Sequence, residues 1–230
     1  MTPEHVRETI AKIRAARGFV LPHHGALAAA LPELHAAYEA MYRALTLEQR
    51  HLSALQKEIC WVAILAACEE PVGTHHVAKF RAVGGDEAMA AAIFRLVGWA
   101  AGARRHACLA QHWQALFPGV PAAEAYVAGL RPLLAGSPLA EGDARLALIA
   151  IHTACDEAFG LAAEIAAAYG VGVPEPCMAE AMSLTIWPRG VNPFVRATEV
   201  WLGVIRAGGV SASAPFRAWA EAPGQGRFSG

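Results

Sequence analysis

Apolar and polar positions follow one another along this chain with the period of α-helices. Leu34, Tyr38, Met41 and Leu45 are spaced three and four residues apart, which places them on one face of a helix. The run from Ile59 to Ala67 is apolar on all faces, which predicts a central, buried helix. The pattern predicts an all-α protein.

Cap residues, glycines and prolines divide the chain into further segments. We expect helices over residues 3–17, 26–45, 74–84, 86–102, 103–117 and 122–134, and another that ends near residue 68. That last helix begins either at Thr46, whose Gln49 completes a capping box, or at Ser53. His23 and His24 follow Pro22, and we expect them to form a solvated pair in a loop.

Several landmark residues recur at a nearly constant separation. Ala67-Cys68-Glu69-Glu70 returns as Ala154-Cys155-Asp156-Glu157, and Gly73 returns as Gly160, in each case 87 residues later. The residues Gly84, Trp99, Gly102 and Trp113 return 88 residues later as Gly172, Trp187, Gly190 and Trp201. The recurrence predicts an internal duplication, although its period is longer than that of a solenoid repeat.

The expected organisation follows from this repeat and from the Gly136-Ser137-Pro138 linker. We expect N-terminal helices over 1–45, a first, site-bearing repeat over 46–136, a second, degenerate repeat over 137–207, and an irregular tail over 208–230 that is rich in Pro, Gly and Ser. The two tandem repeats are expected to pack as one compact helical unit.

Residues that occur in only one repeat are candidates for chemistry, whereas residues kept in both are best explained by packing. Glu58 falls opposite Arg145, His75 opposite Ala162 or Ala163, His76 opposite Ala163 or Glu164, and His106 opposite Phe194. The candidate polar set therefore belongs to the first repeat alone. Cys68 has a counterpart in the second repeat, so its simplest interpretation is a small core residue.

Composition narrows the possible partners and compartments. Hydrophobic residues make up 55% of the 230 residues and charged residues 17%, with a formal net charge of -1 and no basic run, so nucleic acid is not expected as a partner. The longest apolar stretches are too short to span a membrane, and the amphipathic N-terminal segment does not resemble a signal peptide. Five cysteines without a CxxC motif indicate a reducing cytoplasm. The Ala-rich composition favours a homo-oligomer.

The first repeat resembles the carboxymuconolactone decarboxylase and alkylhydroperoxidase superfamily. The residues that carry the resemblance are Glu58, His76, Gly84, Asp86 with Glu87, Trp99 and Gly102, and the second repeat adds the turn Gly190-Val191-Asn192-Pro193. The resemblance covers roughly residues 53–113 and 143–201. It implies a small, all-helical protein that oligomerises.

The two branches of this superfamily imply different chemistry. Peroxidase members use a CxxC motif with a His four residues after its second Cys; here Cys68 and His75 keep that spacing, but Pro71 replaces the second Cys. The decarboxylase branch uses a Glu and a His without metal or organic cofactor. The resemblance therefore implies a cofactor-independent lyase that acts on a small carboxylated or lactone metabolite, with a Cys68-based peroxidase and a non-catalytic duplicated scaffold as the alternatives.

Glu58, with His75 or His76, is the expected proton-transfer group, and the spacing does not decide between the two histidines. His106, Trp61 and Arg104 are the expected substrate-binding residues, since an aromatic ring suits a flat substrate and a cation suits an acidic one. A structural interpretation stays open for Glu58, as a partner of Arg50 or Lys57, and for Arg104, on a solvated face.

No metal site is expected. Neighbouring histidines on a helix point about 100° apart, and the chain has neither an HExxH motif nor paired CxxC motifs.

Overall fold

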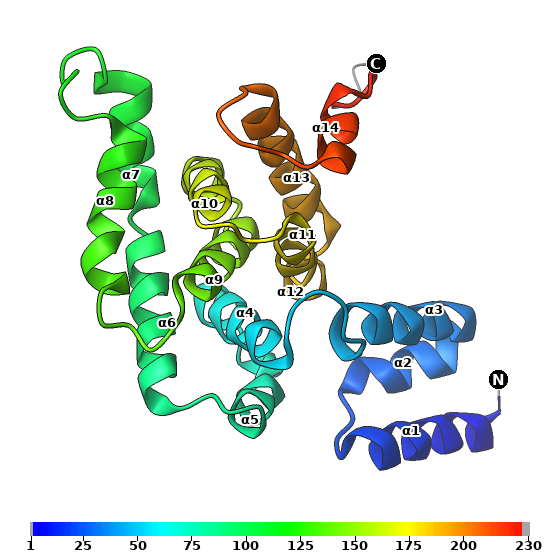
Figure 1. Ribbon diagram of the computed structural model, residues 1–230. Helices are drawn as coiled ribbons and strands as arrows, with labels where there is room; N and C mark the ends of the chain where they lie inside the picture. Colours follow the sequence, from blue (N-terminus) through cyan, green and yellow to red (C-terminus); the bar gives the residue numbers. More distant parts are fainter. Residues whose placement is uncertain (1, 227–230) are drawn as a thin grey trace. The chain divides into compact units, whose positions relative to one another are not determined.

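The computed structural model describes residues 2–226, in which helices joined by turns and loops are present and no strand occurs (Figure 1). Within these residues, every helix is too short or too polar to cross a membrane. The chain divides into two compact units, Met1–Glu48 and Gln49–Gly230. The first unit runs to Glu48, and a π-helical turn, Arg43–Leu47, continues its last helix.

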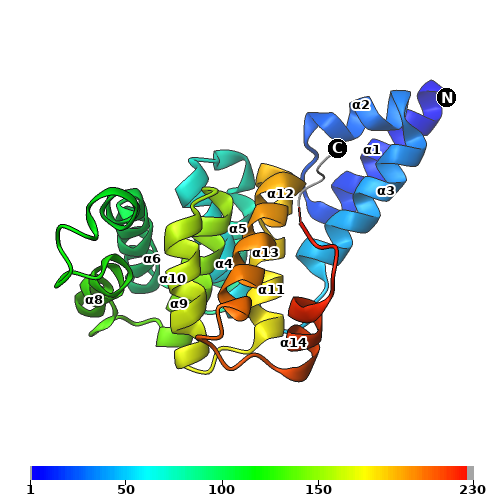
Figure 2. The ribbon, with the colours of Figure 1, turned by 90° about the horizontal axis from the view of Figure 1, so that it is seen from above.

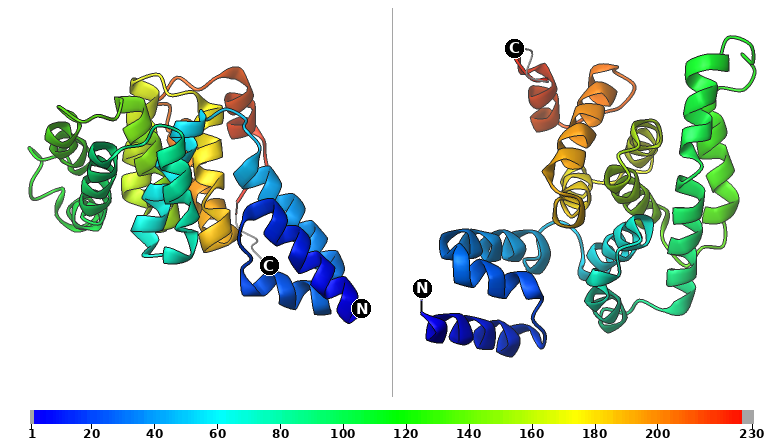
Figure 3. Two further views of the ribbon diagram at one scale, coloured as in Figure 1. Left: turned by 90° about the horizontal axis from the view of Figure 1, so that it is seen from below. Right: turned by 180° about the vertical axis from the view of Figure 1, so that it is seen from behind.

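The first unit is a stack of three helices in which α2 lies between the other two (Figures 1 and 3). Its helices are α1 (Pro3–Arg17), α2 (Pro22–Ala30) and α3 (Pro32–Tyr42). Each begins with a proline in its first turn, where the missing N–H costs no hydrogen bond. The expectation of a solvated loop at His23 and His24 is wrong, since both belong to α2 and His24 is only 1% exposed.

The second unit is built around two adjacent helices, α4 and α9, with α6 and α8 on one side of them and α11 and α13 on the other (Figure 2). Its helices are α4 (Ala54–Cys68), α5 (His75–Ala82), α6 (Glu87–Ala100), α7 (Ala103–Cys108), α8 (Ala122–Leu134), α9 (Glu141–Ala154), α10 (Ala158–Gly170), α11 (Glu175–Ser183), α12 (Ile186–Arg189), α13 (Val191–Arg206) and α14 (Ala214–Glu221).

Helix α4 begins at the second of the two starts that the sequence allows. Ser53 accepts a hydrogen bond from the Gln56 N–H, and the Gln56 side chain accepts one from the Ser53 N–H, which completes a capping box. The helix then runs through apolar residues that are buried from Ile59 to Leu65, and it ends at Cys68. This start places Glu58 in the second turn, inside the packed unit.

Helices α4 and α9 run parallel, because their first turns meet each other and so do their last. Gln56 Nε2 donates to Asp143 Oδ1 at 2.7 Å near the two starts, and the Cys155 thiol lies 3.8 Å from the Ala67 carbonyl oxygen just past the two ends. Both helices supply residues to two apolar clusters, one around Trp61 and the other around Tyr126. The two helices therefore form the centre of the unit.

Local features of α4 and α9 agree at matched positions. Glu69 and Asp156, which follow the two helices, have φ of 54° and 55° and are the non-glycine residues with positive φ in the described chain. A Cβ on Gly73 would lie 2.5 Å from Leu65, and a Cβ on Gly160 would lie 2.4 Å from His152. Leu65 and His152 are themselves matched positions of the two repeats. The two helices thus end in the same backbone conformation, and the chain that follows each of them comes equally close to it at a glycine.

The expected irregular tail over 208–230 is wrong for its middle part. Residues 214–221 form α14, with a proline in its first turn, and Phe216 stacks on Trp201 with ring centroids 4.9 Å apart. The three apolar residues Phe216, Trp219 and Ala220 lie on one face of this helix, but the surrounding Pro, Gly and Ser residues hide that pattern. Residues 227–230 lie outside the described part of the chain.

The two matched glycines give a test of the packing. We expect Gly160→Ala to lower the free energy of unfolding by about 2–3 kcal/mol and Gly73→Ala by about 1 kcal/mol. The reason is that the His152 ring is buried and hydrogen-bonded and cannot move aside, whereas the new Cβ at Gly73 meets the flexible end of Leu65. Urea unfolding of both variants checks the order, and equal losses would contradict it.

Candidate functional site

Glu58 and His76 meet inside the second unit. His76 Nδ1 lies 2.8 Å from Glu58 Oε2, and the two residues are 2% and 6% exposed. Glu58 comes from the buried face of α4 and His76 from the first turn of α5, which a short 3-10 turn at Pro71–Gly73 brings back against α4. Of the two neighbouring histidines that the sequence could not separate, His76 is the one that contacts the carboxylate.

The contact fixes the tautomer of His76. A carboxylate oxygen only accepts, so we assign the proton to Nδ1, and Nε2 then carries the lone pair. Burial lowers the pKa of His76, and its hydrogen bond and charge interaction with Glu58 oppose that shift in part. His76 is therefore a neutral, oriented imidazole at neutral pH, which is the form a general base requires.

Two aromatic rings cover His76. The Trp61 ring stacks on it, with centroids 4.1 Å apart and an interplanar angle of 17°, and the half-buried His75 ring lies 4.3 Å away. The indole N–H of Trp61 is buried and donates to no acceptor in the described chain. An unpaired buried donor is costly unless a ligand or water satisfies it. Trp61, expected as a substrate-binding residue, thus lies beside the catalytic candidates.

Lys57, which the sequence offers with Arg50 as a structural partner of Glu58, forms an ion pair with another carboxylate. Lys57 Nζ lies 3.3 Å from Glu180 Oε1 on α11, and the other Glu180 oxygen accepts hydrogen bonds from the backbone N–H groups of His51 and Leu52. Glu180 thereby fixes the residues that lead into α4.

The second half contains an ion pair where the first half contains Glu58 and His76. Arg145 on α9 donates to Glu164 on α10 at 2.8 Å; the sequence aligns Arg145 with Glu58, and Glu164 is one of the two positions that it aligns with His76. Both side chains are buried, and Arg145 also reaches Glu141 at 2.9 Å. Arg145 Nε and Glu164 Oε1 form no hydrogen bond. If Glu164 is the counterpart of His76, matched positions are in contact in both halves. The acidic residue, however, lies on α4 in the first half and on α10 in the second.

A polar group near this ion pair was not foreseen from the sequence. The Tyr126 hydroxyl on α8 lies 2.8 Å from His152 Nε2, and Glu157 Oε2 lies 3.5 Å from His152 Nδ1. Burial lowers the pKa of His152 to about 3, and burial and the nearby Glu164 carboxylate raise the pKa of Tyr126. His106, expected at the substrate of the first repeat, packs against Tyr126 with ring centroids 5.6 Å apart.

This polar group borders a cavity of about 420 Å³. Its polar lining residues are His152, Thr153, Asp156, Glu157, Arg196 and Glu199. A second cavity of about 390 Å³ in the first half is lined at the corresponding positions by Leu65, Ala66, Glu69 and Glu70. The second half therefore holds the more polar of the two cavities, although the sequence suggested that its chemistry was lost.

Cys68 and Arg104 lie away from the Glu58–His76 contact. Burial and the neighbouring Cys155 raise the pKa of Cys68 to about 11, which opposes a reactive thiolate. Arg104 is exposed on α7, and its charge acts on Cys155. The solvated interpretation of Arg104 agrees with its exposure.

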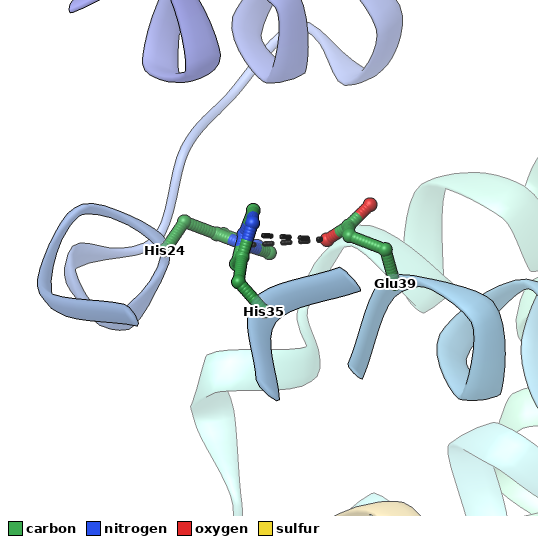
Figure 4. A group of neighbouring side chains, drawn as sticks. All are labelled: His24, His35 and Glu39. Atoms are coloured by element: carbon green, nitrogen blue, oxygen red, sulfur yellow. Dashed lines mark hydrogen bonds and ion pairs between the residues drawn. The ribbon is translucent and has the colours of Figure 1, made fainter. Parts of the chain in front are cut away.

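In the first unit, two histidines and a carboxylate converge (Figure 4). His24 on α2 and both His35 and Glu39 on α3 bring one ligand atom each within 4.8 Å of one another. Histidine nitrogens and carboxylate oxygens are ligands for divalent transition metals. This is the part of the described chain whose side chains could hold such an ion.

Comparisons of the chain with protein-family models, with curated proteins and with solved structures find no match.

The sequence gives only weak indications of the polar residues that were not predicted as site residues. His35 and Glu39 are four residues apart and so share a helix face, which is a ligand spacing, but His24 approaches from another helix. His152 interrupts an apolar run in α9, which marks a buried polar residue. Neither signal shows which groups meet in space.

The lowered pKa of His152 predicts a pH dependence of stability. The unfolded chain binds a proton near pH 6.5 and the folded chain only near pH 3, so the stabilisation present above pH 6.5 is lost as the pH falls. We expect His152→Gln to reduce the slope of unfolding free energy against pH, between pH 6 and pH 4, by about 1.4 kcal/mol per pH unit. Urea unfolding across this range checks it, and parallel slopes would count against the buried neutral imidazole.

The raised pKa of Cys68 predicts an unreactive thiol. With a pKa of about 11, about one Cys68 in ten thousand is a thiolate at pH 7, so alkylation should be about 100-fold slower than for a thiol of pKa 9. Peroxide reduction with a dithiol donor should be as slow in wild type as in Cys68→Ala. Turnover that the substitution abolishes would restore the peroxidase interpretation.

Proposed function

We propose that the protein is a cofactor-independent lyase that acts on a small carboxylated or lactone metabolite, with the Glu58–His76 pair as its proton-transfer group. The observation that carries the proposal is the 2.8 Å contact between His76 Nδ1 and Glu58 Oε2. A carboxylate that orients a neutral imidazole is the arrangement of a general base and its orienting residue.

The chemistry follows from the atoms at this contact. In a decarboxylation the bond between carbon and the carboxylate breaks, carbon dioxide leaves, and the electron pair stays on the substrate carbon, which then takes up one proton. His76 Nε2 first takes up a proton from solvent water, and Glu58 stabilises the imidazolium that forms; Nε2 then donates this proton to the substrate carbon as carbon dioxide leaves, which restores the neutral imidazole. The unpaired Trp61 N–H supplies a donor for a substrate carboxylate or carbonyl oxygen.

The pair is nearly sealed, so a substrate reaches it only when the covering side chains move. His75 is the more exposed of the two histidines and lies against His76, and the first-half cavity is lined by Thr74 and Val77 on either side of them. We therefore propose that the substrate reaches the Glu58–His76 pair past His75, whose side chain lies at this entrance.

The observation that favours a non-catalytic scaffold is the Arg145–Glu164 contact. Two halves that each join the same positions by a charged contact are what a purely structural pair would produce. The matching turns after Glu69 and Asp156 and the parallel packing of α4 and α9 support a tandem duplication of one helical bundle, which we also propose. Self-association is proposed from exposed apolar residues near α7, which include Trp113, Leu116 and Phe117.

The test is turnover of a panel of carboxylated γ-lactones in deuterium oxide, followed by NMR for loss of the carboxyl carbon and for deuterium at the new C–H position. We expect His76→Gln and Glu58→Gln to lower kcat by about 100-fold or more, because each removes a member of the base pair. His112→Gln, at an exposed histidine, is the matched control and should leave kcat unchanged.

His152→Gln distinguishes the two halves. It should retain turnover if the chemistry belongs to the Glu58–His76 pair, provided that its circular dichroism shows a folded protein. Turnover that survives His76→Gln but not His152→Gln would move the site to the polar cavity of the second half. A wild-type protein that releases no carbon dioxide from any member of the panel would contradict the lyase proposal.

A further inference from the structure

The strongest unexplained cluster belongs to the first unit, whereas the proposed lyase site belongs to the second. His24 Nδ1 lies 3.2 Å from His35 Nε2 and 3.3 Å from Glu39 Oε1, and His35 Nε2 lies 3.9 Å from the same Glu39 oxygen (Figure 4). Two imidazole nitrogens and one carboxylate oxygen thus form a small triangle.

The size of this triangle fits a tetrahedral metal ion. Nitrogen and oxygen ligands lie about 2.0–2.2 Å from zinc, so two ligands of a tetrahedral site are about 3.3–3.5 Å apart. The three observed separations bracket this value. Three protein ligands leave the fourth position for water or another ligand.

Glu39 carries the second indication. Its Oε1 atom is buried and accepts no hydrogen bond, although it points at the two imidazole nitrogens. The other oxygen, Oε2, accepts a hydrogen bond from Arg17 NH2 at 2.6 Å, which holds the carboxylate in this orientation. A ligand whose second oxygen is fixed by a neighbouring donor is the usual outer-shell arrangement of a metal site.

The composition of the unit gives a third reason. Its buried apolar residues are Ile13, Ala28 and Tyr42, and its buried polar residues, His24, His35 and Thr46, are as numerous. Helical units of this size seldom bury enough apolar surface to be stable alone, and a bound metal is one of the usual remedies.

Arg17 sets the proton arrangement. Its NH1 lies 3.2 Å from His24 Nε2, which makes Nε2 an acceptor and places the His24 proton on Nδ1. Coordination through Nδ1 requires that proton on Nε2 instead, so Arg17 must give up this contact when an ion binds. Its bond to Glu39 Oε2 is compatible with the ion.

We propose that His24, His35 and Glu39 bind one divalent transition-metal ion, with Zn²⁺ as its best match, and that the ion joins α2 to α3.

The test uses the full-length protein after treatment with a chelator. Zn²⁺ is titrated in competition with a chromophoric chelator, and thermal unfolding is followed with and without Zn²⁺. We expect one tightly bound ion per chain and a melting temperature that rises with Zn²⁺ and falls when the chelator is added. His35→Gln and Glu39→Gln should weaken binding by at least about 100-fold, because each removes a ligand.

His23→Gln is the matched control, because this neighbouring histidine on the same helix lies outside the triangle. It should retain one tight Zn²⁺, while the circular dichroism of each metal-free variant shows whether the helices have formed. Wild-type protein that binds no Zn²⁺ at micromolar concentration would overturn the proposal. So would binding that His35→Gln and Glu39→Gln leave unchanged, since that ion would sit on other histidines. Neither result bears on the Glu58–His76 pair, so the two proposals fail separately.

Discussion

The packing of α4 against α9 is the constraint on which the larger unit depends. Both helices are buried along most of their length, and their neighbours α5, α6, α10 and α11 pack on one or the other. Because nearly every face of α4 is apolar and covered, a charged residue on it must have a partner. Glu58 contacts His76, and Lys57 forms an ion pair with Glu180. On α9, Arg145 forms an ion pair with Glu164.

Sequence periodicity predicted the helical class and, in the larger unit, the helices from α4 to α8, because apolar spacing and cap residues act locally. The comparison of the two repeats and the family resemblance, rather than periodicity, grouped Glu58 with one of two adjacent histidines. The choice of His76 over His75 could not be made, because a difference of one residue turns a side chain by about 100° around a helix whose direction was unknown. The path of α5 decides it.

Contacts between residues of different helices could not be predicted from the sequence for a different reason. Tyr126 meets His152 from a helix 26 residues earlier in the chain, and His24 meets His35 across a helix-to-helix turn. Such contacts depend on how helices pack, which local spacing does not determine. Helix α14 was not predicted because Pro, Gly and Ser are frequent in the tail. The few aromatic residues that pack α14 against Trp201 are a minority of its composition.

The contacts between the parallel helices α4 and α9, which we call the seam, also limit which positions can change independently during evolution. Gln56 contacts Asp143, and Cys155 reaches the Ala67 carbonyl, so a new residue on one side of the seam meets its counterpart in the other half. Glu58 and Arg145, by contrast, each face a partner within their own half. We therefore expect substitutions at these α4–α9 contacts to be correlated, whereas the Glu58–His76 and Arg145–Glu164 pairs can change separately, so that the same helical framework can hold two chemically different polar pairs.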